Sequence, residues 1–142
     1  MRVHHFCFFV AGIAGLAGMG LGMSMGIRQD FALAPVHAHL NLLGWVTLCL
    51  YGLYHRGVAR PSDRLAWVQA GVAVLSLPLM TGGLAGYFLT GTAAFEVVAI
   101  LGSVGTILAM ALFVLVLALD LRREAGPAPA RGTAPGLSAR PI

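Results

Sequence analysis

Charged residues are scarce in this chain. They make up only 10% of its 142 residues, and all nine basic side chains are arginines, since the sequence contains no lysine. Hydrophobic residues account for 58% of the chain, and the mean hydropathy is +0.87. This composition leaves no stretch for a soluble domain and is typical of an integral membrane protein.

Cysteine is equally rare. The two cysteines, Cys7 and Cys49, both fall inside apolar runs, where a free thiol behaves as a small buried hydrophobe. A disulfide framework is therefore not expected.

Four apolar runs reach the ~20 residues that a helix needs to cross a bilayer. We expect spans at about 6–27, 35–55, 65–90 and 94–121, which form an all-α, four-helix membrane bundle within residues 1–122. The first run is longer than the ~7 to 15 residues of a signal-peptide core, and no small-residue cleavage pattern closes it. Residues 123–142 are rich in Pro, Ala, Gly and Arg and are predicted to form a disordered tail.

The arginines are distributed unevenly over the segments outside these spans. Eight of the nine lie at the chain start, between the second and third spans, and in the tail, whereas only Arg28 lies on the other side. By the positive-inside rule both termini are expected to be cytoplasmic, which predicts a multi-pass protein of the cytoplasmic (inner) membrane. The sequence pI of 9.8 then reflects topology and contact with anionic lipid headgroups, not nucleic-acid binding.

Two histidines stand inside the second apolar run, in the segment PVHAHLNLLGW that begins at Pro35. An ionisable side chain at membrane depth costs about 2.5 kcal/mol or more, so His37 and His39 are candidate functional residues that face a partner, a cavity or a ligand. On a helix that advances roughly 100° per residue, positions i and i+2 lie about 200° apart. The two imidazoles therefore point to nearly opposite sides of one helix and cannot readily chelate one ion together.

The surroundings of the two histidines differ. Steps of four and three from His37 pass through mostly small or polar residues, namely Asn41, Gly44, Leu48, Tyr51 and His55. The same steps from His39 pass through an apolar wall, namely Leu43, Val46, Leu50 and Leu53. Both settings suit a large flat ligand with a metal centre, and Gly44 leaves room for it beside the His37 face. Without such a ligand, the two histidines would only make interhelical hydrogen bonds.

Small residues recur at steps of four in the first span, at Ala14, Gly18, Gly22 and Gly26. This spacing predicts the close approach of another helix, either within the bundle or between subunits. The same part of the span carries three methionines, Met19, Met23 and Met25. Thioethers are ligands for copper(I), and methionine is also ordinary core filler.

Three further ionisable residues lie near the predicted membrane surfaces. His4 and His5 precede the first span, where we expect them to be solvated or in contact with lipid headgroups. Glu96 begins the fourth span at a depth similar to that of the paired histidines. It is expected to snorkel to water, with an imidazole N–H or a transferred proton as its alternative partner.

The segment HAHLNLLGW resembles the paired-histidine helix of the haem-copper oxidase and nitric oxide reductase catalytic subunit. The chain also resembles small four-span bacterial membrane proteins of that superfamily. In the large enzymes an H-x-H on the second helix of a four-helix arc ligates a haem on each side, and three such arcs surround a pseudo-threefold axis. The resemblance implies that His37 and His39 are haem ligands. It does not extend to dioxygen reduction, because the H-x-x-x-Y pattern and the intramembrane His-His pair of the copper site have no counterpart in this sequence.

The resulting hypothesis is a b-type haem protein that transfers electrons or senses redox state or a gas. Covalent attachment is not expected, because no C-x-x-C-H occurs. Two alternatives remain open, namely a copper-handling membrane protein that uses His37, His39 and the methionines, and an assembly or structural factor without a cofactor.

The placement of the histidines also predicts an assembly. One subunit cannot readily clamp both faces of the same haem, so His37 of one subunit is expected to face His39 of the next. Rotational symmetry satisfies every histidine in a closed ring, and the likeness to a three-arc enzyme favours a homotrimer. The glycine ridge of the first span would then help neighbouring subunits approach.

Overall fold

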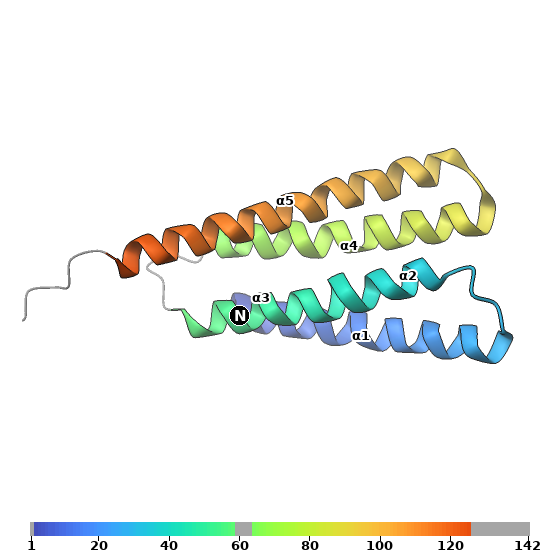
Figure 1. The fold of residues 1–142 in the computed structure, drawn as a ribbon, viewed down its shortest axis with the longest axis horizontal. Coiled ribbons are helices and arrows are strands. Elements are labelled where there is room, and N and C mark those ends of the chain that lie inside the picture. The colour runs from blue at the N-terminus through green and yellow to red at the C-terminus, as the bar shows by residue number, and fades with distance from the viewer. Residues whose placement is uncertain (1, 59–63, 126–142) are drawn as a thin grey trace, which may run out of the picture.

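The computed structural model describes residues 2–58 and 64–125, and every regular element in these ranges is helical (Figure 1). The elements are α1 (Val3–Arg28), α2 (Ala34–His39), the π-helix η1 (Leu40–Thr47), α3 (Leu48–Gly57), α4 (Arg64–Thr90) and α5 (Ala93–Glu124). The predicted tail begins at 123, but α5 continues to Glu124. The rest of that prediction, from 126 onward, lies outside the described residues.

The chain is a multi-pass membrane protein. The segments α2, η1 and α3 follow one another without a break, so the described residues form four helices long and apolar enough to cross a bilayer, with lengths of 26, 24, 27 and 32 residues. The predicted all-α bundle is confirmed, and each predicted span boundary agrees with the helices to within three residues.

The four spans form two antiparallel hairpins. In the first, α1 packs along α2, η1 and α3, and in the second, α4 packs along α5 (Figure 1). Helix α4 supplies most of the contact between the hairpins, since it touches α1 and all three segments of the second span. We call the end with residues 29–33 and 91–92 the hairpin end, and the opposite end the terminal end.

The best-packed core lies toward the terminal end. Its fully buried members are small or medium side chains, namely Val3, Cys7, Ala11, Leu48, Tyr51, Ala66 and Ala70. Cys7 is 0% exposed and is not in a disulfide, as expected for a small buried hydrophobe. His4 differs from its prediction, because α1 already begins at Val3 and carries the His4 ring inward, to 9% exposure, next to the Phe8 ring.

Buried polar side chains also join the two hairpins at the terminal end. The hydroxyl of Tyr54 donates to Oδ2 of Asp120 at 3.0 Å, and Arg123 pairs with Oδ1 of the same carboxylate at 3.1 Å. Nε2 of His55 lies 3.0 Å from Oε1 of Gln69. Interhelical hydrogen bonds of this kind add to van der Waals packing in holding helices together in lipid.

Glycines allow α4 and α5 to approach closely. A Cβ at Gly102 would collide with the backbone of Met80, and one at Gly83 would collide with the backbone of Ala99. Each collision is with main-chain atoms, which cannot rotate away. The second hairpin is therefore held by backbone proximity that only glycine permits.

Candidate functional site

The paired histidines stand at the point where the second span changes from α-helix to π-helix. His37 and His39 belong to α2, and η1 starts at the next residue, Leu40. Because the α-helical rotation holds through His39, the two side chains leave this helix about 200° apart, as the sequence predicts. Isolated π-helical turns within α-helices occur frequently at functional sites.

The His37 imidazole lies in a notch on α1. Its Nδ1 is 2.7 Å from the carbonyl oxygen of Gly18. A Cβ at Gly22 would lie 2.6 Å from Cε1 and 3.0 Å from Nδ1 of the ring, so the space above Gly22 is filled by the imidazole itself. The glycine at position 22 is thus what allows the ring to reach the Gly18 carbonyl.

Asn41 supports the same ring one turn further along. Its Nδ2 donates to the backbone carbonyl of His37 at 2.9 Å and lies 3.3 Å from Nδ1 of the imidazole. A Cβ at Gly18 would lie 2.6 Å from this Nδ2. Asn41 therefore fills the next notch along α1 and holds the α2 backbone at His37 in place.

The glycine ridge of α1 is therefore used inside the chain. Gly15 receives the Trp45 ring, whose Cγ would lie 3.1 Å from a Cβ there, and Gly18 and Gly22 receive Asn41 and His37. The prediction of close helix approach is confirmed within the bundle. These three notches are filled and do not offer a surface to a neighbouring subunit.

His39 is held by its own helix. Its Nδ1 lies 2.6 Å from the carbonyl oxygen of Pro35, four residues earlier. Pro35 stands in the first turn of α2, where its fixed φ suits the helix and its missing N–H is no loss. The imidazole is half-buried, as is that of His37.

The two backbone contacts require a hydrogen on Nδ1 of each ring. A carbonyl oxygen can only accept a hydrogen bond, so Nδ1 of His37 donates to Gly18 and Nδ1 of His39 donates to Pro35. In a neutral imidazole the other nitrogen, Nε2, then carries the lone pair. Metal-ligating histidines commonly have this arrangement, in which a backbone carbonyl orients the ring and leaves Nε2 free to coordinate. The donor set therefore fits a haem iron at either ring.

Gly44 has a different role from the predicted one. A Cβ at this position would lie 2.6 Å from Cβ of Ala14 and 2.9 Å from Cδ2 of Leu77, so α1 and α4 already fill the space beside it. Gly44 allows three helices to meet and leaves no room there for a flat ligand. The rest of its stripe does face the bundle, since Leu48, Tyr51 and His55 are 1%, 4% and 5% exposed.

The other predicted donors do not gather around the histidines. Met19 and Met23 are 54% and 68% exposed, whereas Met25 is buried on a different side of α1. Glu96 is exposed in the first turn of α5. Among the residues that the structure describes, no group of three or more His, Cys, Asp or Glu side chains could hold a metal ion.

Sequence reasoning missed the partners that orient the two rings. The Gly18 and Pro35 carbonyls are backbone atoms, which no residue pattern displays. The packing of His37 on Gly22 could have been predicted from the sequence. Positions 37, 41 and 45 on one helix and positions 22, 18 and 15 on an antiparallel helix are spaced by similar steps, so they can pair in order. No protein-family model, curated protein or solved structure matches this chain.

Proposed function

We propose that the protein is a membrane haem b protein in which His37 and His39 supply axial ligands. One observation carries this proposal: both Nδ1 atoms donate to backbone carbonyls, so both Nε2 atoms present a lone pair. Two half-buried imidazoles with this tautomer within one turn of a membrane helix are not explained by packing alone, because each is costly at that depth.

Electron transfer is the activity that this ligand set favours. A haem with both axial positions filled by imidazole supplies reversible one-electron chemistry without an open site for oxygen. The chain's own contribution is to hold the two rings. His37 is fixed by Gly18, Gly22 and Asn41, so its orientation changes little between oxidation states. Redox or gas sensing becomes the function if one axial position is free.

The ligands of one haem are proposed to come from two subunits. The 200° divergence of the two side chains on α2 prevents one chain from clamping both faces of a haem. In a closed ring, His37 of one subunit and His39 of the next would hold the same haem. A homotrimer is favoured because the HAHLNLLGW segment resembles part of an enzyme built from three four-helix arcs. The notches at Gly15, Gly18 and Gly22 are already filled by side chains of the same chain. The contact between subunits is therefore expected elsewhere on the surface.

The proposed orientation has both termini in the cytoplasm of a bacterium and the hairpin end outside the inner membrane. The arginine distribution supports it, since Arg28 is the only arginine at the hairpin end among the residues that the structure describes. A reporter fused after Ile142 should then read as cytoplasmic, and one inserted after Gly91 as periplasmic. The reverse pattern would place the histidines in the inner leaflet.

The absorption spectrum of the purified protein tests the function. We expect a Soret band with sharp low-spin visible bands, which His37→Ala and His39→Ala each weaken or convert to high spin. His5→Ala is the matched control, because His5 is exposed in the first turn of α1 and far along the helix from the site. Unchanged spectra in both single variants would refute the ligand assignment. Stoichiometric copper without a Soret band, or no chromophore at all, would favour the two alternative functions.

Native mass spectrometry in detergent tests the sharing of haem. A haem-loaded trimer is expected, and a haem-loaded dimer or tetramer would retain the sharing while rejecting the threefold analogy. A haem-loaded monomer would contradict the shared-ligand arrangement.

A further inference from the structure

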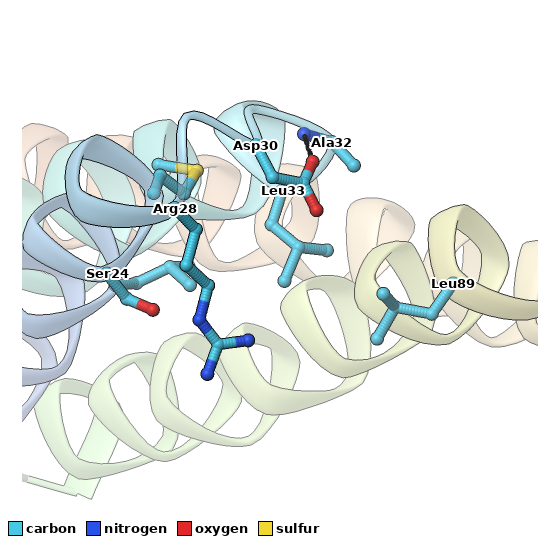
Figure 2. A pocket seen from close by; sticks show the side chains of 8 residues that line it. Ser24, Arg28, Asp30, Ala32, Leu33 and Leu89 are labelled. Atoms are coloured by element: carbon cyan, nitrogen blue, oxygen red, sulfur yellow. Dashed lines mark hydrogen bonds between the residues drawn. The ribbon is translucent and has the colours of Figure 1, made fainter.

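A hollow with both charged and apolar side chains in its lining opens at the hairpin end, between α1, the 29–33 connection and α4. Its volume is about 110 Å³, and its lining includes Leu21, Ser24, Arg28, Asp30, Leu33 and Leu89 (Figure 2). Both formal charges at this end of the first hairpin, Arg28 and Asp30, therefore meet in one place. The hollow lies where a bilayer presents its headgroups.

The two charges enter the hollow from separate walls. Within the part of the chain described, no ion pair joins Arg28 to Asp30. Figure 2 shows the Arg28 guanidinium extending toward α4, away from the Asp30 carboxylate. One oxygen of Asp30 accepts the Ala32 N–H at 3.0 Å, which fixes the carboxylate at the mouth. A ligand here meets a cation and an anion at different positions.

A second, apolar hollow lies deeper in the membrane and has no lining residue in common with the first; we call the two hollows together the groove. The apolar hollow measures about 270 Å³ and is lined on the α1 side by Val10, Ile13, Ala14 and Ala17, and elsewhere mainly by Leu40, Leu77 and Pro78. On α1, the steps from Ala17 to Leu21 and on to Arg28 are one and two turns, so both hollows lie on the same side of this helix. Leu33 and Leu40 of the second span stand two turns apart in the same way.

The dimensions of this groove match one leaflet. Arg28 and Ala17 are 11 residues apart on α1, which corresponds to roughly 16 Å along the helix at 1.5 Å per residue. Half of the hydrocarbon core of a bilayer is about 15 Å. A chain that starts at the headgroup level beside Arg28 would therefore reach the deeper hollow near the membrane centre.

We propose that this groove binds one phospholipid with a phosphoethanolamine headgroup. The phosphate pairs with the Arg28 guanidinium and accepts from the Ser24 hydroxyl, since arginine binds phosphate through two parallel hydrogen bonds. The ammonium group faces the Asp30 carboxylate, and one acyl chain lies along the apolar hollow. The site is separate from the paired histidines, because His37 packs against the Gly18 and Gly22 side of α1.

The chemistry of the groove distinguishes this ligand from simpler ones. A free phosphate would use Arg28 but leave the apolar hollow without a role. Phosphatidylglycerol would pair its phosphate with Arg28 but would present only neutral hydroxyl groups to Asp30, which would leave that carboxylate without a cation. Only a zwitterionic headgroup on an acyl chain uses the cation, the anion and the apolar wall together.

Native mass spectrometry of delipidated protein in mild detergent tests the proposal, with dioleoyl phosphatidylethanolamine and dioleoyl phosphatidylglycerol as competing probes. We expect the wild-type chain to retain one phosphatidylethanolamine in preference to phosphatidylglycerol. Arg28→Gln should lower its apparent affinity about tenfold, the change that loss of a charge-assisted pair worth ~1.4 kcal/mol produces. Arg122→Gln is the control, because Arg122 is exposed at the opposite end of the molecule.

Two further variants test the headgroup and the groove separately. Asp30→Asn keeps the oxygen that accepts the Ala32 N–H and should abolish the preference between the two lipids without abolishing binding. Ala17→Phe should weaken binding of the full lipid but not of glycerophosphoethanolamine, which has no acyl chains. Ala17 is exposed, so the larger side chain is tolerated, and Ala17→Leu is the smaller replacement should the first fail to fold.

Several results would overturn the proposal. Equal retention of both lipids by the wild-type chain would remove the headgroup assignment, and an unchanged affinity in Arg28→Gln would remove the phosphate contact. Full lipid binding by Ala17→Phe would leave only an adventitious anion at Arg28. A change of oligomeric mass in Ala17→Phe would show that the groove is a contact between copies of the chain.

Discussion

Two glycines two residues apart on α1 provide a direct test of the histidine notch. A Cβ at Gly22 would lie 2.6 Å from Cε1 of His37, whereas a Cβ at Gly20 meets nothing within 4 Å. Carbon atoms normally approach to about 3.5–4.0 Å, so Gly22→Ala requires the imidazole to move by roughly 1 Å. The same methyl group at Gly20 requires no movement.

The expected cost follows from what this displacement breaks. Overpacking of this kind costs about 1–3 kcal/mol, and stretching the 2.7 Å bond from Nδ1 to the Gly18 carbonyl removes a further ~0.5–1.5 kcal/mol. Replacing glycine by alanine in a helix interior also stabilises both variants by up to ~1 kcal/mol. This gain cancels between the two variants, so we expect Gly22→Ala to be about 1.5–4.5 kcal/mol less stable than Gly20→Ala.

This difference in the free energy of unfolding can be measured by titrating each variant, in mild detergent micelles, with dodecyl sulfate. Far-UV circular dichroism reports the helix content during the titration. Trp45 fluorescence adds a local signal, because its ring lies on Gly15 in the neighbouring notch. In the haem-loaded protein Gly22→Ala should also alter the low-spin spectrum, whereas Gly20→Ala should not. Equal stability of the two alanine variants would refute the notch, and equal stability with altered spectra only in Gly22→Ala would retain the ligand role but not the packing energy.

Three other predictions concern the scaffold. Tyr54→Phe removes the 3.0 Å hydrogen bond to the buried Asp120 carboxylate and should lower the free energy of unfolding by about 1.5–3 kcal/mol in the same detergent assay; no change would show that this contact does not join the hairpins. Thr47→Val removes the 2.8 Å bond from the Thr47 hydroxyl to the carbonyl five residues earlier and should cost about 0.5–1.5 kcal/mol, unless the π-helix is set by packing alone. Gly102→Leu collides with α4 backbone, so it should unfold at a temperature well below that of Gly71→Leu, whose site is open; similar melting temperatures would contradict the close α4–α5 approach.

The spans were predictable because apolar length is a strong local signal. Each helix boundary in the described ranges lies within three residues of the expected one. The sequence predicted that Leu48, Tyr51 and His55 share one helix face, and the structure shows that this face is buried. The three residues stay on one face because α3 is a regular α-helix from Leu48 onward.

Contacts between distant segments were not predictable from periodicity. Tyr54 and Asp120 are 66 positions apart, and nothing local to either residue identifies the other. His4 was expected at the surface because it is polar and near the chain start, but α1 begins at Val3 and places His4 on the same buried face as Cys7 and Ala11. Gly44 was assigned to a ligand because its missing side chain leaves space, and only the neighbouring helices show that Ala14 and Leu77 use that space.

The polar contacts divide the molecule into two functional halves. Those that orient His37 and His39 come from α1 and α2 alone, through Gly18 and Pro35. Those that tie the first hairpin to the second lie at the terminal end and involve other side chains. Interhelical hydrogen bonds add to van der Waals packing in membranes, so within the described residues the polar part of the contact between the hairpins is concentrated at the terminal end. The orientation of both imidazoles is therefore set within the first hairpin, and the proposed lipid would not need to displace either ring.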